Sequence, residues 1–325
     1  MADNKWQIQN PKSKIENLKW RLPQLALVIA ALILMVRTER FFTPGTLTSI
    51  LTQASIVGVL ALGQAFVLLG GGFDLSQGAM LALTAAATAH LVQRGVSPVV
   101  AGAAALAIGA LLGSINGVMV AAVRSNPFVT TLSTLLIFRG AAFIILGGQP
   151  LSNIRVFQAI DSGFTLGSTF LPFRGVLFLA LTVLSWLILR QTIFGQHIYA
   201  LGGNAEAARL SGVKTVRLRV ETFLLSGLAA GVASILFLSW LRVAKPDTAT
   251  GYELDSIAAC VVGGVSLQGG RGSVLGAAAG CLLLQALRTQ ITMSGFPEEY
   301  RTLVTGIVIL TFAAADALAR RHERA

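Results

Sequence analysis

The stretch GQAFVLLGGGFDLSQGAMLAL, residues 63–83, places three consecutive glycines and an aspartate between two apolar runs. Glycine weakens helical order, and inside a bilayer the backbone groups that a broken helix frees must find partners within the protein or in a water-lined cavity. We therefore expect a helix of a membrane domain to break at Gly71 and Gly72. The break should face away from lipid, and it would carry Asp74 to membrane depth.

Asp74 has two interpretations. Gln77 follows it by three residues just before a helical run, which is a variant of the capping box, so that Asp74 would cap the next helix. Alternatively, Asp74 and Ser76 line a polar route through the membrane, because ionisable residues at membrane depth are costly and usually functional. Both roles can hold at once.

The composition of the whole chain is that of a membrane protein. Of its 325 residues 54% are hydrophobic and 12% charged, and the mean hydropathy is +0.73, whereas soluble chains carry roughly 25% charged residues. We expect an all-α polytopic protein of about ten transmembrane helices in one membrane domain, 22–316. The expected spans are 22–36, 49–71, 75–93, 97–122, 127–148, 172–190, 217–241, 254–268, 272–292 and 300–316. The third and eighth of these border glycine-rich breaks and are candidates for broken or re-entrant helices.

The distribution of positive charge predicts the orientation. If the N-terminus is cytoplasmic, most of the 25 Lys and Arg residues fall on the cytoplasmic side, as the positive-inside rule requires. The cytoplasmic side then includes the tail 1–21, the loop 191–216 with the basic residues that flank it from Arg190 to Arg219, the tail 317–325, and two short turns at Arg124 and Arg271. The apolar run LPQLALVIAALILMV has a basic flank like a signal peptide, but no small-residue cleavage site follows, so we interpret it as a retained first span.

The charge and the cysteines exclude several other classes of protein. The net charge of +11 comes from short basic clusters between apolar runs, without a basic face carrying aromatic residues, so the expected partner is the lipid bilayer and not nucleic acid. Cys260 and Cys281 lie in apolar runs and the three histidines are scattered. This pattern predicts neither a disulfide framework nor a metal site.

Arg139 stands near the middle of the expected span 127–148. An arginine at that depth costs about 2.5–3.5 kcal/mol. We therefore expect it to face the interior of the bundle and to meet a carbonyl or carboxylate group. A structural clamp and a direct role in the translocation pathway both remain open.

A second glycine-rich break is VVGGVSLQGGRGSVLGAAAG, residues 261–280. The spacing of Gly272, Gly276 and Gly280 predicts a stripe of small residues that lets helix backbones approach closely, and a gating hinge is the alternative. The G-x-x-x-x-G-K frame of a phosphate loop is absent. The candidate packing or hinge residues are Gly263, Gly264, Gly269, Gly270, Arg271 and Gly272.

The loop 191–216 contains a short helix signal. Asn204 can cap a helix, Glu206 and Arg209 can pair at i,i+3, and Gly212 can end it. The segment is either a solvated loop helix or a docking surface for a cytoplasmic partner, with Leu210 on the same turn.

Three segments resemble the signature segments of the ribose-type (simple sugar) permeases of bacterial ABC importers, a family of binding-protein-dependent inner-membrane components. The resemblance spans roughly residues 45–315, and NPFVTTLSTLLIFRGAAFIILGGQP, residues 126–150, resembles the fifth-span region of that family. The signature segments are GQAFVLLGGGFDLSQGAMLAL (63–83), GQHIYALGGNAEAARLSGV (195–213) and ELDSIAACVVGGVSLQGGRGSVLGAAAG (253–280).

The resemblance implies a fold like that of the cobalamin importers, in the bacterial inner membrane with both termini cytoplasmic. It implies a second permease subunit, cytoplasmic ABC ATPase subunits that carry ATP and Mg, and a periplasmic sugar-binding protein, with no cofactor and no enzymatic activity in this chain. Asp74 and Ser76 fall on the D-L-S element of the family, whereas Phe73 and Gln77 depart from its usual aliphatic residues. The residues that would couple to the ATPase are Asn204, Glu206, Arg209, Leu210 and Gly212.

The resulting hypothesis is a permease for a monosaccharide such as ribose, galactose, xylose, fructose or inositol. Permeases of the same fold for branched-chain amino acids, nucleosides or a furanose-like signal are alternatives. An ion-coupled carrier would need several buried acids at mid-membrane, and Asp74 is the only candidate. A membrane enzyme would need paired carboxylates, a histidine cluster or a nucleophile with its base, which the spans lack.

Overall fold

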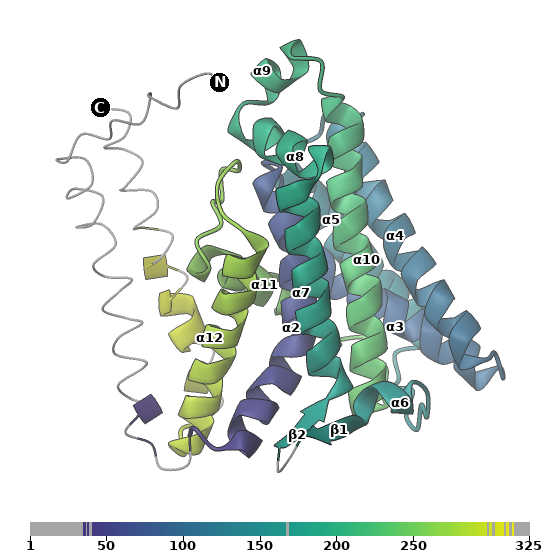
Figure 1. Cartoon of the computed structure of the whole chain (residues 1–325). Helices are drawn as coiled ribbons and strands as arrows, with labels where there is room; N and C mark the ends of the chain where they lie inside the picture. The colour runs from purple at the N-terminus through teal and green to yellow at the C-terminus, as the bar shows by residue number, and fades with distance from the viewer. Residues whose placement is uncertain are drawn as a thin grey trace. The chain divides into compact units, whose positions relative to one another are not determined.

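The computed structural model describes residues 35–36, 38, 41–166, 169–297, 299–300, 303–308, 310–311 and 314. The chain is mostly helical (Figure 1) and divides into two units, Phe42–Ala286 and a second that joins Met1–Phe41 to Leu287–Ala325. The expected span 22–36 lies outside the described residues except for 35–36, and the span 300–316 is described only in part. The tails 1–21 and 317–325 lie wholly outside the described residues.

Each expected span between residues 49 and 292 contains one helix of the structure. Six helices are long and apolar enough to cross a membrane among the described residues: α2, α4, α5, α7, α10 and α12. The two spans that border the glycine-rich breaks hold the shorter helices α3 and α11. The bounds are α2 Pro44–Leu69, α3 Gln77–Gln93, α4 Pro98–Ala121, α5 Pro127–Leu146, α7 Phe173–Gln191, α10 Thr215–Leu241, α11 Tyr252–Val262 and α12 Val274–Met293.

Local sequence explains where three of the long helices begin. α2, α4 and α5 each start with a proline, whose missing N–H is not needed in the first turn. The preceding residues Thr43, Ser97 and Asn126 each accept a hydrogen bond from a first-turn N–H. These signals place the helix starts independently of tertiary packing.

A close helix crossing joins α4 to α10 through glycines that were not singled out from the sequence. A Cβ on Gly109 would lie 2.3 Å from the carbonyl oxygen of Gly227, and one on Gly113 would lie 2.2 Å from that of Phe223. A Cβ on Gly117 would lie 2.8 Å from the Cα of Val220. Glycines four residues apart on α4 therefore bring the two backbones into contact, which is the general use of small residues between membrane helices.

The expectation of an all-α chain is wrong in the segment between α5 and α7. This segment holds a short helix, α6 (Gln158–Asp161), and an antiparallel hairpin of β1 (Gly163–Leu166) and β2 (Thr169–Pro172). Hydropathy identifies long apolar runs, whereas this hairpin depends on two strands of four residues each with β propensity. The hydroxyl of Thr48 on α2 donates to the carbonyl oxygen of Phe170 at 3.0 Å and ties the hairpin to the bundle.

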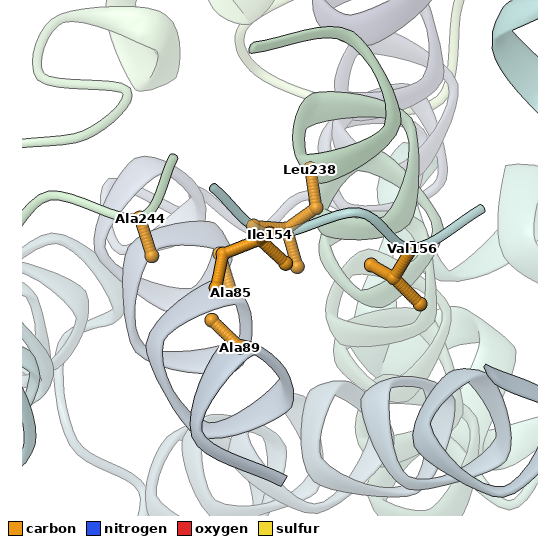
Figure 2. Close-up of a cluster of buried hydrophobic side chains, with 6 residues drawn as sticks. All are labelled: Ala85, Ala89, Ile154, Val156, Leu238 and Ala244. Carbon is orange, nitrogen blue, oxygen red and sulfur yellow. The ribbon is translucent and has the colours of Figure 1, made fainter. Parts of the chain in front are cut away.

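The loop that follows α5 is anchored by apolar packing. Figure 2 shows Ile154 and Val156 from this loop beside Ala85 and Ala89 of α3 and Leu238 of α10, in a cluster that also includes Ala244. Backbone hydrogen bonds pair residue 151 with residue 244, at 2.8 and 3.0 Å. The loops after α5 and α10 are therefore held together at one end of the bundle.

At the opposite end, two short helices connect α7 to α10 (Figure 1): α8 (Ile193–Gly203) and α9 (Ala205–Leu210). The sequence predicted one helix in this loop, which is α9, and α8 is a second helix that was not predicted. In the second unit, Nε2 of Gln290 donates to the hydroxyl of Thr38, and Nη2 of Arg288 donates to that of Thr305 at 3.3 Å.

Candidate functional site

Asp74 lies fully buried at the centre of a hydrogen-bond network. Its Oδ1 accepts from the backbone N–H of Ser76 at 2.9 Å and from the Ser76 hydroxyl at 2.7 Å. Its Oδ2 accepts from the hydroxyl of Ser226 on α10 at 2.7 Å. The Ser76 hydroxyl also accepts from Nδ2 of Asn116 on α4 at 2.7 Å. One carboxylate thus joins the start of α3 to α4 and α10.

Gln77 extends this network to two more helices. Its Nε2 donates to the carbonyl oxygen of Leu60 on α2 at 3.1 Å and to the hydroxyl of Ser226 at 2.8 Å. Its Oε1 accepts from the hydroxyl of Ser256 on α11 at 2.8 Å. These three partners stand near the middle of their helices, so α3 begins inside the bundle and the preceding segment runs inward from the end of α2.

The capping box expected at Asp74 is not formed. α3 begins at Gln77 with Ser76 as the N-cap residue, and no side chain caps its first turn. Asp74 accepts from the N–H of Ser76, which precedes the helix, and the amide of Gln77 points to other helices. The physical reason is that both side chains find partners across the bundle, where a buried polar group must be satisfied.

Three glycine-rich segments meet where α2 ends. A Cβ on Gly202, at the end of α8, would lie 1.9 Å from the carbonyl oxygen of Leu69 and 2.4 Å from the N of Gly270. The N–H of Gly270 donates to the carbonyl oxygen of Leu69 at 2.9 Å. A Cβ on Gly269 would lie 2.8 Å from the Cα of Gly71. A side chain at Gly202, Gly269 or Gly270 does not fit among these backbone atoms. We call this site the glycine junction, and it consists of residues 69–71, 202–203 and 269–270.

The residues predicted to form a helix in the loop 191–216 do form α9. Oδ1 of Asn204 accepts from the N–H groups of Glu206 at 3.1 Å and of the next residue at 3.0 Å. Gly212 follows the helix at φ +87°, and its N–H donates to the carbonyl oxygen of Arg209 at 3.0 Å. The cap and the left-handed glycine therefore define both ends of α9.

The outer surface of α9 carries an ion pair and an apolar side chain. Nε of Arg209 donates to Oε2 of Glu206 at 3.0 Å, and Nη2 donates to Oε1 at 2.6 Å. These hydrogen bonds lower the pKa of the Glu206 carboxyl, which is therefore ionised near neutral pH. Leu210 beside the pair is 74% exposed. Because Gly202 and Gly203 directly precede Asn204, α9 is attached to the glycine junction without a spacer.

The glycines of the second break have two different functions in the structure. A Cβ on Gly263 would lie 2.0 Å from the carbonyl oxygen of Gly276, and one on Gly280 would lie 2.1 Å from that of Ala259, so α11 and α12 pack backbone to backbone. Gly272 does not belong to this stripe: it precedes α12 and has φ +122°. Left-handed backbone also occurs at residues 264, 269 and 270, and Arg271 stands exposed in this loop.

Arg139 contacts the loop after α10. Its Nη1 donates to the carbonyl oxygen of Pro246 at 3.2 Å and to that of Thr248. None of its hydrogen bonds to described residues reaches the Asp74 network. This geometry is that of a carbonyl clamp, and it holds the loop at the end of the bundle opposite α9.

Replacing Arg139 with methionine is expected to speed hydrogen exchange in the loop 245–250 about tenfold or more. The variant loses two hydrogen bonds from a charged donor, each worth about 1.5–3 kcal/mol. Exchange of the protein in nanodiscs, followed by mass spectrometry, measures the change. Arg139→Lys should restore protection in part, and Arg155→Met, at an exposed position on the neighbouring loop, is the control. Equal exchange in the Arg139→Met variant and the wild type would contradict the clamp.

The structure thus joins most, but not all, of the residues predicted from sequence. Gly71, Asp74, Ser76 and the residues of α9 belong to one connected region, while Arg139 acts elsewhere. Gly202, Ser226 and Ser256 were not predicted from the sequence. Two features of the sequence could have identified them: Ser226 and Ser256 are polar residues within apolar spans, and Gly202 belongs to a glycine pair directly before the cap of α9. Among the described residues, no three His, Cys, Asp or Glu side chains gather in one place.

Comparison with known proteins tests the resemblance. The profile of the family described as branched-chain amino acid transport system, permease component, matches residues 46–313. The chain is 38% identical to the ribose import permease of Escherichia coli strain K12 over 306 residues, 91% of this chain and 94% of that protein. It is 38% identical to the ribose import permease of Bacillus subtilis strain 168 over 297 residues, 90% and 91% of the two chains. It is 39% identical to the galactofuranose transporter permease of Escherichia coli strain K12 over 269 residues, 82% and 78%.

These matches confirm the resemblance to ribose-type permeases. The family match covers residues 46–313, nearly the range 45–315 of the resemblance, and the helices are those of a protein that crosses the membrane several times. The family consists of transport components and not of catalytic subunits. The protein is therefore a member of the branched-chain amino acid transport system permease family, a multi-pass membrane component of a transporter.

Proposed function

We propose that this chain is the transmembrane permease subunit of an ATP-binding-cassette importer that moves a monosaccharide. The observation that carries the proposal is the likeness, over nine tenths of the chain, to permeases named for ribose import. Relatives named for galactofuranose and fructose support a sugar more broadly. Because the family is described by branched-chain amino acid transport, a branched-chain amino acid is the second candidate substrate, after a sugar.

We assign α9 as the site where the ATPase docks. Its exposed Leu210 and its ion pair between Glu206 and Arg209 offer an apolar and a charged contact on one rigid turn. The ATPase would hold ATP and Mg, and this chain would carry out no bond chemistry. The side that carries α9 is then cytoplasmic, as are both termini.

The proposed mechanism transmits motion from α9 through the glycine junction. A displacement of α9 acts on Gly202, which contacts the end of α2 and the loop before α12 at backbone distance. That loop and the segment after Gly71 can move only together, and the same segment leads to Asp74. ATP-driven movement at the cytoplasmic surface would thus reach the polar interior of the bundle.

The remaining parts of the assembly follow from the same proposal. A second permease subunit, identical or homologous, completes the pathway, and each subunit has the ten spans of the cobalamin-importer type. A periplasmic binding protein delivers the sugar to the loops after α5 and α10, which are held together by backbone pairing between residues 151 and 244.

Exchanging the charges of α9, with Glu206→Lys and Arg209→Glu together, is expected to reduce sugar uptake and sugar-stimulated ATP hydrolysis at least about tenfold. Both charges that face the partner are inverted, and a tenfold effect corresponds to ~1.4 kcal/mol of lost coupling. The measurement is uptake into proteoliposomes that hold the complete transporter, with ATP hydrolysis followed in the same sample.

Arg217 and Glu221 form an ion pair of the same kind on the surface of α10. The control variant exchanges these two charges, with Arg217→Glu and Glu221→Lys. This variant should keep most of the coupled hydrolysis. Transport at the wild-type rate with α9 inverted would remove the docking proposal. Failure of membrane insertion is checked separately by detergent extraction and size-exclusion chromatography.

A further inference from the structure

A cavity of about 470 Å³ with both polar and apolar walls lies at the end of the bundle opposite α9. It is bounded by the first turns of α2, by β2, by the start of α7 and by the end of α10. A cavity of this size is within the range of small-ligand sites. The lining residues used below are Ser49, Thr52, Gln53, Asp161, Arg174 and Trp240.

Arg174 is buried in the wall of this cavity with unused hydrogen-bond donors. The residue is 4% exposed, and its Nη2 pairs with Oδ1 of Asp161 at 3.1 Å. Its guanidinium stands over the Trp240 ring, 5.1 Å from the centroid. Its Nε and Nη1 have no hydrogen-bond partner in the described part of the chain. Buried N–H groups in folded proteins normally have a hydrogen-bond acceptor, so we expect these two nitrogen atoms to meet one.

The opposite wall presents hydroxyl and amide groups from one face of α2. The Ser49 hydroxyl accepts from Nε2 of Gln53 at 2.9 Å, and the Thr52 hydroxyl donates to the carbonyl oxygen of Thr48 at 2.7 Å. Both hydroxyl oxygens keep hydrogen-bonding capacity toward the cavity. The walls therefore offer donors and acceptors at several positions around one small volume.

The charge of the cavity favours a neutral ligand. Asp161 is shared between Arg174 and Arg242, whose Nη2 lies 3.6 Å from Oδ2 of Asp161. Arg242 is half exposed and does not line the cavity, so the ionisable side chains of its walls are Asp161 and Arg174, whose charges cancel. Nε and Nη1 of Arg174 have no acceptor among the described residues. A ligand that matches these walls is uncharged, carries several hydroxyl groups, and has an apolar face that packs on an aromatic ring such as Trp240.

We propose that this cavity binds a monosaccharide weakly, as a receiving site where the sugar first enters the permease. Hydroxyl oxygens of the sugar accept from Nε and Nη1 of Arg174, and its hydroxyl groups exchange hydrogen bonds with Ser49 and Thr52. The inference rests on the proposed function, because α9 on the ATPase side makes the opposite end the side of arrival.

The test titrates D-ribose into the permease in nanodiscs, without binding protein and without ATP, and follows tryptophan fluorescence. We expect saturation in the millimolar range, and loss of the signal in Trp240→Phe. Ser49→Ala combined with Thr52→Val should weaken binding about tenfold, because two hydrogen-bonding hydroxyls are removed. Ser114→Ala combined with Ser133→Ala, two serines that bond only within their own helices, should bind ribose like the wild type.

Three results would overturn the inference: no ribose-dependent change, equal affinity in the two double variants, or tighter binding of gluconate than of ribose. In the complete transporter, Ser49→Ala with Thr52→Val should slow uptake more than ATP hydrolysis and leave the affinity for the binding protein unchanged. A lowered affinity for that protein would instead make the cavity part of its docking surface. If the transporter takes up ribose with ATP but the cavity does not bind it, only this inference is overturned. If the cavity binds ribose but no ATP-driven uptake occurs, the transport proposal is overturned instead.

Discussion

Replacing Gly202 with alanine is expected to destabilise the protein by about 3 kcal/mol and to abolish most transport. The added Cβ would lie 1.9 Å from the carbonyl oxygen of Leu69 and 2.4 Å from the N of Gly270. Both neighbours are backbone atoms, so neither can rotate away, and the hydrogen bond between Gly270 and Leu69 must stretch or break. Thermal unfolding in detergent measures the stability, and uptake into proteoliposomes measures the function.

Gly203→Ala is the matched control for this experiment. It changes the next residue, at the same helix end, and its Cβ would meet nothing within 4 Å. We expect its unfolding midpoint and its uptake to be close to those of the wild type. If the two alanine variants behave alike, the glycine junction is not the tight contact that the proposed mechanism requires. If Gly202→Ala is stable and active, the junction transmits nothing.

Replacing Asp74 with leucine is expected to destabilise the protein by about 3 kcal/mol or more, with a smaller loss for asparagine. Asp74 accepts three buried hydrogen bonds, and a buried donor left without its partner costs about 1–3 kcal/mol. Asparagine keeps an acceptor for Ser76 but presents an N–H₂ group toward Ser226. Unfolding in detergent and ATP-driven uptake, measured on both variants, separate the fold from the transport function.

A double-mutant cycle tests whether Asp74 acts through Ser226. The effects of Asp74→Asn and Ser226→Ala on the free energy of unfolding should deviate from additivity by about 1 kcal/mol, because the two side chains share a hydrogen bond. Ser239→Ala supplies the control on the same helix, since the buried hydroxyl of Ser239 bonds only to the carbonyl oxygen of Leu236. Additive effects in the first pair would contradict the network.

The local features that depend on neighbouring residues could be predicted from the sequence. The apolar runs between residues 49 and 292 each contain a helix, and the cap at Asn204 with Gly212 defines α9 as expected. The glycines at 70–72 do interrupt the helical chain between α2 and α3. Hydropathy, capping chemistry and glycine conformation act over a few residues, which is why one sequence is enough to read them.

The partners of the buried polar groups could not be predicted in this way. Asp74 looked like a helix cap, but its hydrogen bonds reach Ser226, more than a hundred residues later in the chain. Gly272 seemed to belong to a helix stripe, yet it lies before α12 with φ +122°. The crossing of α4 and α10 at Gly109 and Gly113 was likewise missed, because a small-residue pattern does not identify the helix that it contacts.

By itself the sequence determined that this protein is a helical membrane protein with a break before Asp74 and a capped helix in a basic loop. Its signature segments also determined the family. Only the tertiary structure decided that Gly202, Gly71 and Gly270 meet, that Arg139 clamps a distant loop, and that Arg174 lines a cavity. The physical reason is that hydropathy and capping are properties of adjacent residues, whereas each of these contacts joins segments far apart in the chain and exists only after the helices have packed.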